Sequence, residues 1–152
     1  SEFPNAQLRL GGTGDTEKLT QIIQSKGLQN HVHLLGWVAG DLKREEIDHA
    51  DIFCLPSYHE QMPMSLLEAM SAKMGVVATA IGGIPDIIEP EKNGLLFNPG
   101  DQEALYQALH QLLESPQHAE KLAQKAQEDY KSLYCEPVIM GQLTQIYQEL
   151  ER

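Results

Sequence analysis

Two carboxylates, Glu60 and Glu68, lie eight residues apart in the segment HEQMPMSLLEAM. The apolar run Ile52–Leu55 before it predicts a buried strand, and Pro63 predicts the start of a helix that runs to about Met74. Glu60 then lies in the loop near the positive end of the helix dipole, and Glu68 lies in the helix beside its apolar stripe. A charge beside an apolar layer is costly unless a partner hydrogen-bonds it. The pair therefore indicates a site for a polar ligand or, alternatively, a helix cap and a solvated glutamate.

A second segment, GGTGDT at residues 11–16, follows a predicted strand and opens a predicted helix, as a dinucleotide fingerprint would. Glu17 stands where the third glycine of that fingerprint belongs. After the next strand come Trp37 and Val38, and not an acidic residue that could hold an adenosine ribose. We therefore interpret the segment as a tight turn and expect no nicotinamide chemistry.

The chain has 152 residues, with 22 acidic and 11 basic side chains and a formal net charge of −11. This length predicts one domain. The negative charge argues against nucleic acid as a partner, because binding to a phosphate backbone needs clustered Lys and Arg. A helix terminus can still hold the phosphate of a small ligand. No apolar run approaches the roughly 20 residues of a transmembrane segment, and the chain does not begin like a signal peptide.

The cysteines and histidines predict neither a disulfide framework nor a metal site. Cys54 lies in a predicted buried strand, and Cys54 and Cys135 alone cannot staple a domain of this size. His31 and His33 share one face of a strand, but no Cys or carboxylate stands at ligand spacing from them. We expect a reduced, cytoplasmic protein.

Apolar runs and helix signals alternate along the chain. Five strands are predicted at residues 7–11, 32–35, 52–55, 76–79 and 94–97, and helices at 15–26, 41–49 and 63–74 lie between them. Three further helices are predicted to begin near Asp101, Pro116 and Pro137. This order predicts an α/β fold with a doubly wound, mostly parallel sheet, whose ligands bind at the carboxyl ends of the strands. The loops 11–15, 36–41, 56–63 and 80–85 lie there.

From Pro4 to its end the chain resembles the C-terminal, donor-binding domain of the group-1 retaining glycosyltransferases, which have the two-domain GT-B architecture with Rossmann-like domains. The segments that carry the resemblance occur in the family's order: LRLGGTGD, VHLLGWV, DIFCLPS, EQMPMSLLEAM, VVATAIGGIPDII and NGLLFNPGD. Glu60 and Glu68 match the family's E-x7-E motif in spacing and context.

The resemblance implies roles for these positions. Glu60 is expected to be catalytic, contacting the transferred sugar and helping to place its anomeric carbon, and Glu68 to accept hydrogen bonds from the donor's ribose. The other donor-binding positions are backbone amides at the helix start, backbone near the nucleobase, and a glycine pair where a side chain would crowd the ligand. The amides at the helix start are those of Gln61, Met62, Met64 and Ser65. The backbone near the nucleobase is that of Trp37 and Val38, and the glycine pair is Gly82 and Gly83.

The implied reaction transfers a sugar from a nucleoside diphosphate sugar to an acceptor hydroxyl with retention of configuration, in glycan, polysaccharide or glycolipid synthesis. No metal or other cofactor is expected. The acceptor glycan or glycolipid binds to an N-terminal domain, which we expect to be missing here, so that residues 1–152 form a single donor domain of a larger enzyme. We expect that enzyme to be cytoplasmic, either free or peripheral on the cytoplasmic face of a membrane. The alternatives are a GT-B sugar-nucleotide epimerase and a non-catalytic nucleotide-sugar binding module.

Three departures from the family pattern lead to further expectations. Lys73 and Gly75 stand where the family usually has glycine and proline, which predicts altered local structure, and Asp86 replaces a common glutamate. The family's first strand and helix, with an Arg and a Lys that grip the diphosphate, are expected to be missing. That strand lies between the strands that match residues 7–11 and 52–55. We therefore expect these two to pair directly or to exchange edges in a dimer caused by truncation, and the fragment alone to be inactive.

Overall fold

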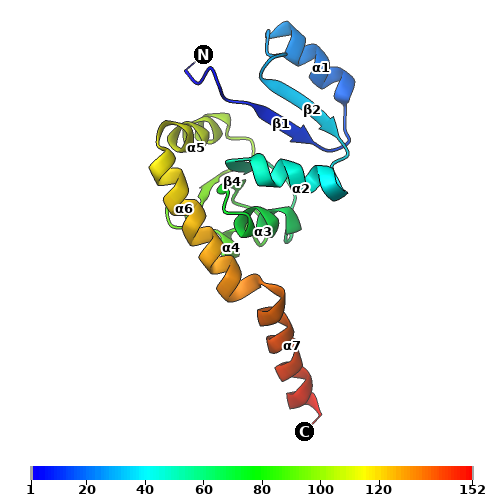
Figure 1. Cartoon of the computed structure of the whole chain (residues 1–152), viewed down its shortest axis with the longest axis vertical. Coiled ribbons are helices and arrows are strands. Elements are labelled where there is room, and N and C mark those ends of the chain that lie inside the picture. Colours follow the sequence, from blue (N-terminus) through cyan, green and yellow to red (C-terminus); the bar gives the residue numbers. More distant parts are fainter. Residues whose placement is uncertain (1, 152) are drawn as a thin grey trace. The chain divides into compact units, whose positions relative to one another are not determined.

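The computed structural model describes residues 2–151, which form two compact units, one ending at His49 and one beginning at Ala50 (Figure 1). In both units parallel strands alternate with helices, so the prediction of an α/β fold is confirmed. The strands form two separate sheets, one of β1 and β2 and one in the order β3-β4-β5. The expected direct pairing of residues 7–11 with 52–55 would join strands of the two units and stays a prediction.

The first unit contains β1 (Leu8–Gly11), α1 (Thr16–Ser25), β2 (Val32–Gly36) and α2 (Gly40–His49). The side chain of Asp15 caps α1 by accepting a hydrogen bond from the amide of Lys18 at 3.0 Å. Arg9 of β1 forms a bidentate ion pair with Glu46 of α2, and this hydrogen bond lowers the pKa of Glu46. Helix α1 buries no residue, so its apolar side chains are not part of a core.

The second unit begins with β3 (Ile52–Leu55), α3 (Met64–Ser71), β4 (Gly75–Thr79), α4 (Ile84–Ile87) and β5 (Leu95–Phe97). It continues with α5 (Gln102–Glu114) and α6 (Pro116–Asp129). A π-helical turn, η1 (Tyr130–Tyr134), then leads into α7 (Glu136–Leu150). The short helix α4 and the π-helical turn were not predicted, whereas β3 has the predicted bounds.

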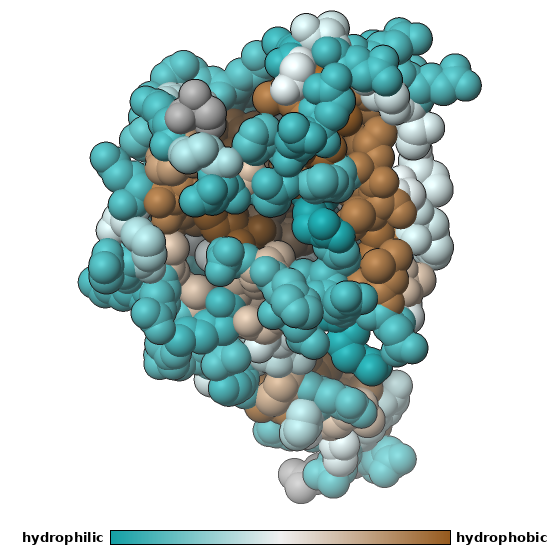
Figure 2. All heavy atoms as spheres, turned by 45° about the horizontal axis from the view of Figure 1, so that its top comes forward, coloured by the Kyte–Doolittle hydropathy of each residue, from teal (hydrophilic) through white to brown (hydrophobic). Residues whose placement is uncertain are grey.

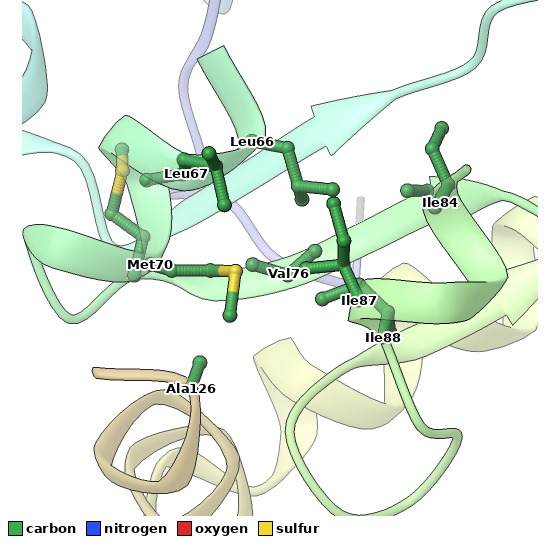
Figure 3. Packing of buried hydrophobic residues seen from close by; sticks show 11 residues of the cluster. Leu66, Leu67, Met70, Val76, Ile84, Ile87, Ile88 and Ala126 are labelled. Carbon is green, nitrogen blue, oxygen red and sulfur yellow. The ribbon is translucent and has the colours of Figure 1, made fainter. Parts of the chain in front are cut away.

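The core of the second unit lies on both faces of its sheet. All five residues of the central strand β4 are buried, and the side chains of Val76, Val77 and Ala78 alternate between two apolar clusters. Val76 belongs to the cluster under α3 and α4, where Figure 3 shows Leu66 and Met70 close to it. Val77 belongs to the cluster under α5 and α6. Helices therefore cover both faces of this sheet, as predicted for a doubly wound fold.

Helix α7 buries none of its residues. Its large apolar side chains are exposed, among them those of Leu143, Ile146, Tyr147 and Leu150. In Figure 2 apolar side chains are visible among polar ones on the face in view. Helix α7 thus has apolar side chains that the rest of the second unit does not cover.

Candidate functional site

Glu60 lies in the loop that joins β3 to α3, as predicted, and its side chain is partly buried. Its carboxylate oxygen Oε1 accepts a hydrogen bond from the hydroxyl of Ser57 at 2.9 Å. A hydrogen bond to a charged acceptor is stronger than one between neutral groups. The loop therefore holds the Glu60 carboxylate with one of its own side chains.

Ser57 is itself tied to the central strand. The hydroxyl of Thr79, the last residue of β4, donates to the backbone oxygen of Ser57 at 2.9 Å and lies 3.4 Å from that of Leu55. Thr79 is completely buried, so its hydroxyl needs a partner within the protein. The start of the Glu60 loop is thereby fixed to the core of the second unit.

The glycine pair Gly82-Gly83 packs against the same loop from the other end. The amide of Gly83 donates to the backbone oxygen of Gln61 at 2.8 Å, and a Cβ on Gly83 would lie 2.6 Å from that oxygen. Gly82 has a positive φ of 54°, and a Cβ there would overlap the carbonyl group of Glu60. The loop backbone itself leaves no room for side chains at these two positions. The expectation that a side chain would crowd a ligand there stays a prediction.

An open pocket of about 590 Å³ lies along this loop. Its lining residues are Tyr58, His59, Glu60, Gln61, Ile81 and Gly82. Three of the predicted site residues, Glu60, Gln61 and Gly82, therefore line the same pocket. The lining residues include a glutamate, a histidine, a glutamine and a tyrosine beside Ile81 and Gly82, and such a mixture of polar and apolar residues suits a polar small molecule.

Helix α3 begins beside the pocket-lining loop. Its N-cap is Pro63, which has an extended backbone and no side chain that can cap the helix. The first turn, with Met64 and Ser65, therefore presents its amide groups and the positive end of the helix dipole near the loop. Met62 and Met64 are both exposed.

Glu68 lies in the second turn of α3, between the buried residues Leu67 and Ala69, and it is partly buried. Its backbone oxygen accepts hydrogen bonds from the hydroxyl of Ser71 at 2.7 Å and from the amide of Ala72 at 3.0 Å. The predicted position beside the apolar stripe of the helix is confirmed. Its contact with a ribose stays a prediction.

Trp37 and Val38 belong to the first unit, where they follow β2. Trp37 is 74% exposed, so its indole is not a core side chain. Val38 is partly buried and packs against Gly11, where an added Cβ would lie 2.9 Å from its Cγ2 atom. Their predicted contact with a nucleobase is not tested by this structure.

Ser57 and Thr79, which hold Glu60 in place, were not among the predicted site residues. Thr79 carried a usable signal, since it is a polar residue at the end of the apolar strand sequence GVVAT. Ser57 could have been found from its spacing of three residues before Glu60 in a tight loop. Tyr58, His59 and Ile81 also line the pocket and were not predicted.

Other chemistry finds little support in the described part of the chain. Between residues 2 and 151 no group of three His, Cys, Asp or Glu side chains could hold a metal ion. Burial raises the pKa of Cys54 to about 11, so this thiol stays protonated near neutral pH. No helix among these residues is long and apolar enough to cross a bilayer.

Comparisons with known proteins identify the family and the fold of the chain. The chain is 31% identical over 147 residues to the phosphatidyl-myo-inositol mannosyltransferase of Mycobacterium leprae, and the match covers 96% of this chain and 38% of that protein. Among solved structures, Anabaena HepE in complex with UDP has a TM-score of 0.86 at 25% identity, covering 96% of this chain and 42% of that one.

A third similar protein is itself a single domain. The C-terminal domain of the group 1 glycosyl transferase LpcC from Francisella tularensis has a TM-score of 0.72 at 27% identity, covering 80% of this chain and 63% of that chain. The fold is thus that of the C-terminal domain of GT-B glycosyltransferases. Residues 1–129 match the family described as glycosyl transferases group 1. The chain therefore belongs to the group 1 glycosyl transferase family.

Proposed function

We propose that the chain is the donor-binding domain of a retaining glycosyltransferase, which moves a sugar from a nucleoside diphosphate to an acceptor hydroxyl. The observation that carries this proposal is the placement of Glu60, which lines an open pocket in the loop before α3 and whose carboxylate is held by Ser57. The family membership of residues 1–129 supports it.

Glu60 is the catalytic residue of this proposal. Its carboxylate contacts hydroxyl groups of the transferred sugar and places the anomeric carbon for attack by the acceptor. A group that holds a reactant in a productive orientation lowers the barrier by reducing the entropy lost in the reaction step. The fixed loop on which Glu60 lies favours this role, because a mobile carboxylate would have to be ordered in every turnover.

The start of α3 binds the diphosphate and the sugar through its backbone. The amides of Gln61, Met62, Met64 and Ser65 are the donors, and the positive end of the helix dipole stabilises the charge that develops on the leaving diphosphate. Pro63 supports this assignment because its ring cannot cap the helix, which leaves the first turn to other partners.

Glu68 and the first unit bind the nucleoside. The carboxylate of Glu68 accepts hydrogen bonds from the ribose hydroxyls, while the backbone at Trp37 and Val38 meets the base. The partial burial of Glu68 between Leu67 and Ala69 favours this role over that of a freely solvated glutamate.

The remaining parts of the enzyme lie outside this chain. The chain spans less than half the length of the mannosyltransferase and of HepE. We propose that a second domain binds the acceptor, a glycan or glycolipid, and that the 152 residues alone do not turn over. The complex of HepE with UDP makes a UDP-sugar the first donor to test.

The test uses the full-length enzyme from which this domain comes. Calorimetric titration with UDP, GDP and ADP identifies the base, and release of nucleoside diphosphate is then followed with and without acceptor. We expect release to depend on an acceptor, beyond slow hydrolysis of the donor, and the product anomer, read by NMR, to keep the donor's configuration. We expect Glu60→Ala to nearly abolish transfer with little change in stability.

Glu149→Ala, at an exposed glutamate of α7, is the matched control and should keep full activity. Full transfer by Glu60→Ala would refute the catalytic assignment. Binding of nucleotide without any transfer or hydrolysis would instead favour a non-catalytic binding module, and conversion of the donor sugar to its epimer would favour an epimerase.

A further inference from the structure

The loop between β3 and α3 is anchored on both sides of Glu60. On one side the Thr79 hydroxyl donates to the backbone oxygen of Ser57 at 2.9 Å, and on the other the Gly83 amide donates to the backbone oxygen of Gln61 at 2.8 Å. Only residues 58–60 lie between these two anchors. Both anchors come from β4 and the turn after it, so one segment fixes the backbone on each side of the carboxylate.

The side chain of Ser57, the residue at the first anchor, also contacts the Glu60 carboxylate. The Ser57 hydroxyl donates to Glu60 Oε1 at 2.9 Å, and both residues are partly buried. We propose that Ser57 is a positioning residue that orients the Glu60 carboxylate for sugar transfer, with Thr79 holding Ser57 in place. This inference rests on the proposed function of Glu60.

The chemistry of the hydroxyl explains why a serine suits this position. A glutamate side chain has several rotatable bonds and loses that freedom when a reaction needs one rotamer. The Ser57 hydroxyl donates its hydrogen bond to Oε1 before substrate binds. We therefore assign Oε2 as the oxygen that contacts the sugar. A site that is ordered in advance does not lose this side-chain entropy at the reaction step.

A positioning role for Ser57 has consequences that a merely stabilising role does not have. If Ser57 acts through Glu60, its loss lowers kcat and leaves the KM of the donor nearly unchanged, because Glu68 and the α3 amides still bind the nucleotide. Its effect also disappears once Glu60 is absent, since residues that act as one unit are not additive. A serine that only stabilised the loop would lower the melting temperature and would act equally in both backgrounds.

The experiment compares Ser57→Ala, Ser57→Thr, Glu60→Ala and the double variant in the full-length enzyme. We expect Ser57→Ala to lower kcat roughly ten- to a hundredfold, with a donor KM within about twofold of wild type. Ser57→Thr keeps the hydroxyl and should recover most of the rate. The double variant should be no slower than Glu60→Ala. Ser132→Ala is the control, since it removes an exposed hydroxyl that donates a hydrogen bond to the backbone oxygen of Asp129. It should change neither kcat nor the KM of the donor.

Three results would overturn the inference: unchanged kcat in Ser57→Ala, a lost rate that Ser57→Thr does not recover, or an equal loss with and without Glu60. An inactive Glu60→Ala beside a fully active Ser57→Ala would overturn this inference and keep the proposed function. A fully active Glu60→Ala would refute both this inference and the catalytic assignment of Glu60.

A second readout does not depend on activity. In the 152-residue chain, the side-chain carboxylate ¹³C resonance of Glu60 should move in Ser57→Ala and stay in place in Ser132→Ala. A resonance that does not respond to Ser57→Ala would show that the hydroxyl does not hold the carboxylate.

Discussion

The side-chain amide of Asn93 donates to the Asp129 carboxylate at 2.9 Å and thereby joins the turn before β5 to the end of α6. The same amide donates to the backbone oxygen of Ile87 at 3.1 Å, and its oxygen accepts from the amide of Glu89 at 2.8 Å. Asn93 is 4% exposed, so water cannot replace these partners.

We expect Asn93→Ala to lower the free energy of unfolding by about 2–4 kcal/mol, because it leaves several buried groups without partners. Urea denaturation followed by circular dichroism measures this change. Asn98→Ala, at an exposed asparagine after β5, should stay within about 0.5 kcal/mol of wild type. Equal stability of the two variants would show that the Asn93 contacts contribute nothing.

Lys73 lies in the left-handed region with a φ of 61°, at the end of α3. The amides of Lys73 and Met74 donate to the backbone oxygens of Met70 and Ala69, which is the Schellman motif that glycine favours. This motif ends α3 at Ser71, three residues before the predicted end at Met74. Lys73, where the family usually has glycine, thus has the left-handed backbone conformation that glycine favours.

Lys73→Gly should therefore be more stable than Lys73→Ala by about 1 kcal/mol. Both variants lose the partly exposed ion pair with Glu120 at 3.1 Å, so their difference isolates the backbone contribution. Thermal unfolding of both proteins measures it. An alanine variant as stable as the glycine variant would contradict the assignment of strain to Lys73.

Gly82→Ala should unfold with a free energy lower by about 2 kcal/mol or more, because the new methyl group would overlap the carbonyl of Glu60 at a positive φ. Gly141→Ala is the matched control, since nothing lies within 4 Å of its Cβ position in the exposed helix α7. It should be neutral or slightly stabilising. If both variants keep wild-type stability in urea titrations, the close approach of Gly82 to the loop has no energetic consequence.

Local signals in the sequence were enough for much of the fold. The side chains of Asp15 and Asp101 cap α1 and α5 near the predicted starts of these helices, by accepting from amides three residues later, and Pro116 opens α6. Each of these signals acts within one turn of the chain. The four-residue helix α4 has no room for a periodic pattern, and the left-handed turn at Lys73 uses a residue that does not favour it.

The contacts that position the site are not local, and this is why the sequence did not reveal them. Thr79 lies 22 residues after Ser57, and the two meet only because β3 and β4 pair side by side. Gly82 meets the Glu60 loop for the same reason. The E-x7-E motif was sufficient to locate Glu60 and Glu68. The groups that hold the Glu60 carboxylate could be identified only from the fold.

Glu68→Ala in the full-length enzyme should weaken binding of the donor nucleotide without removing the chemistry. A hydrogen bond to a charged group contributes about 1.5–3 kcal/mol, so loss of the ribose contact should raise Kd roughly ten- to a few-hundredfold. Calorimetry with UDP measures the change, and Glu149→Ala on α7 should leave Kd unaltered. Unchanged affinity in Glu68→Ala would mean that Glu68 is only a partly buried surface glutamate.

The isolated 152-residue chain should bind UDP or UDP-glucose only weakly, with a Kd on the order of millimolar or poorer. Its pocket is lined by a glutamate and a histidine but by no Lys or Arg, so a diphosphate would be held by backbone amides alone. The formal net charge of −11 adds repulsion. Calorimetry on the isolated chain tests this, with the full-length enzyme as the positive control. A low-micromolar complex with the isolated chain would contradict the prediction, and it would mean that Glu68 and the α3 amides are sufficient for donor binding.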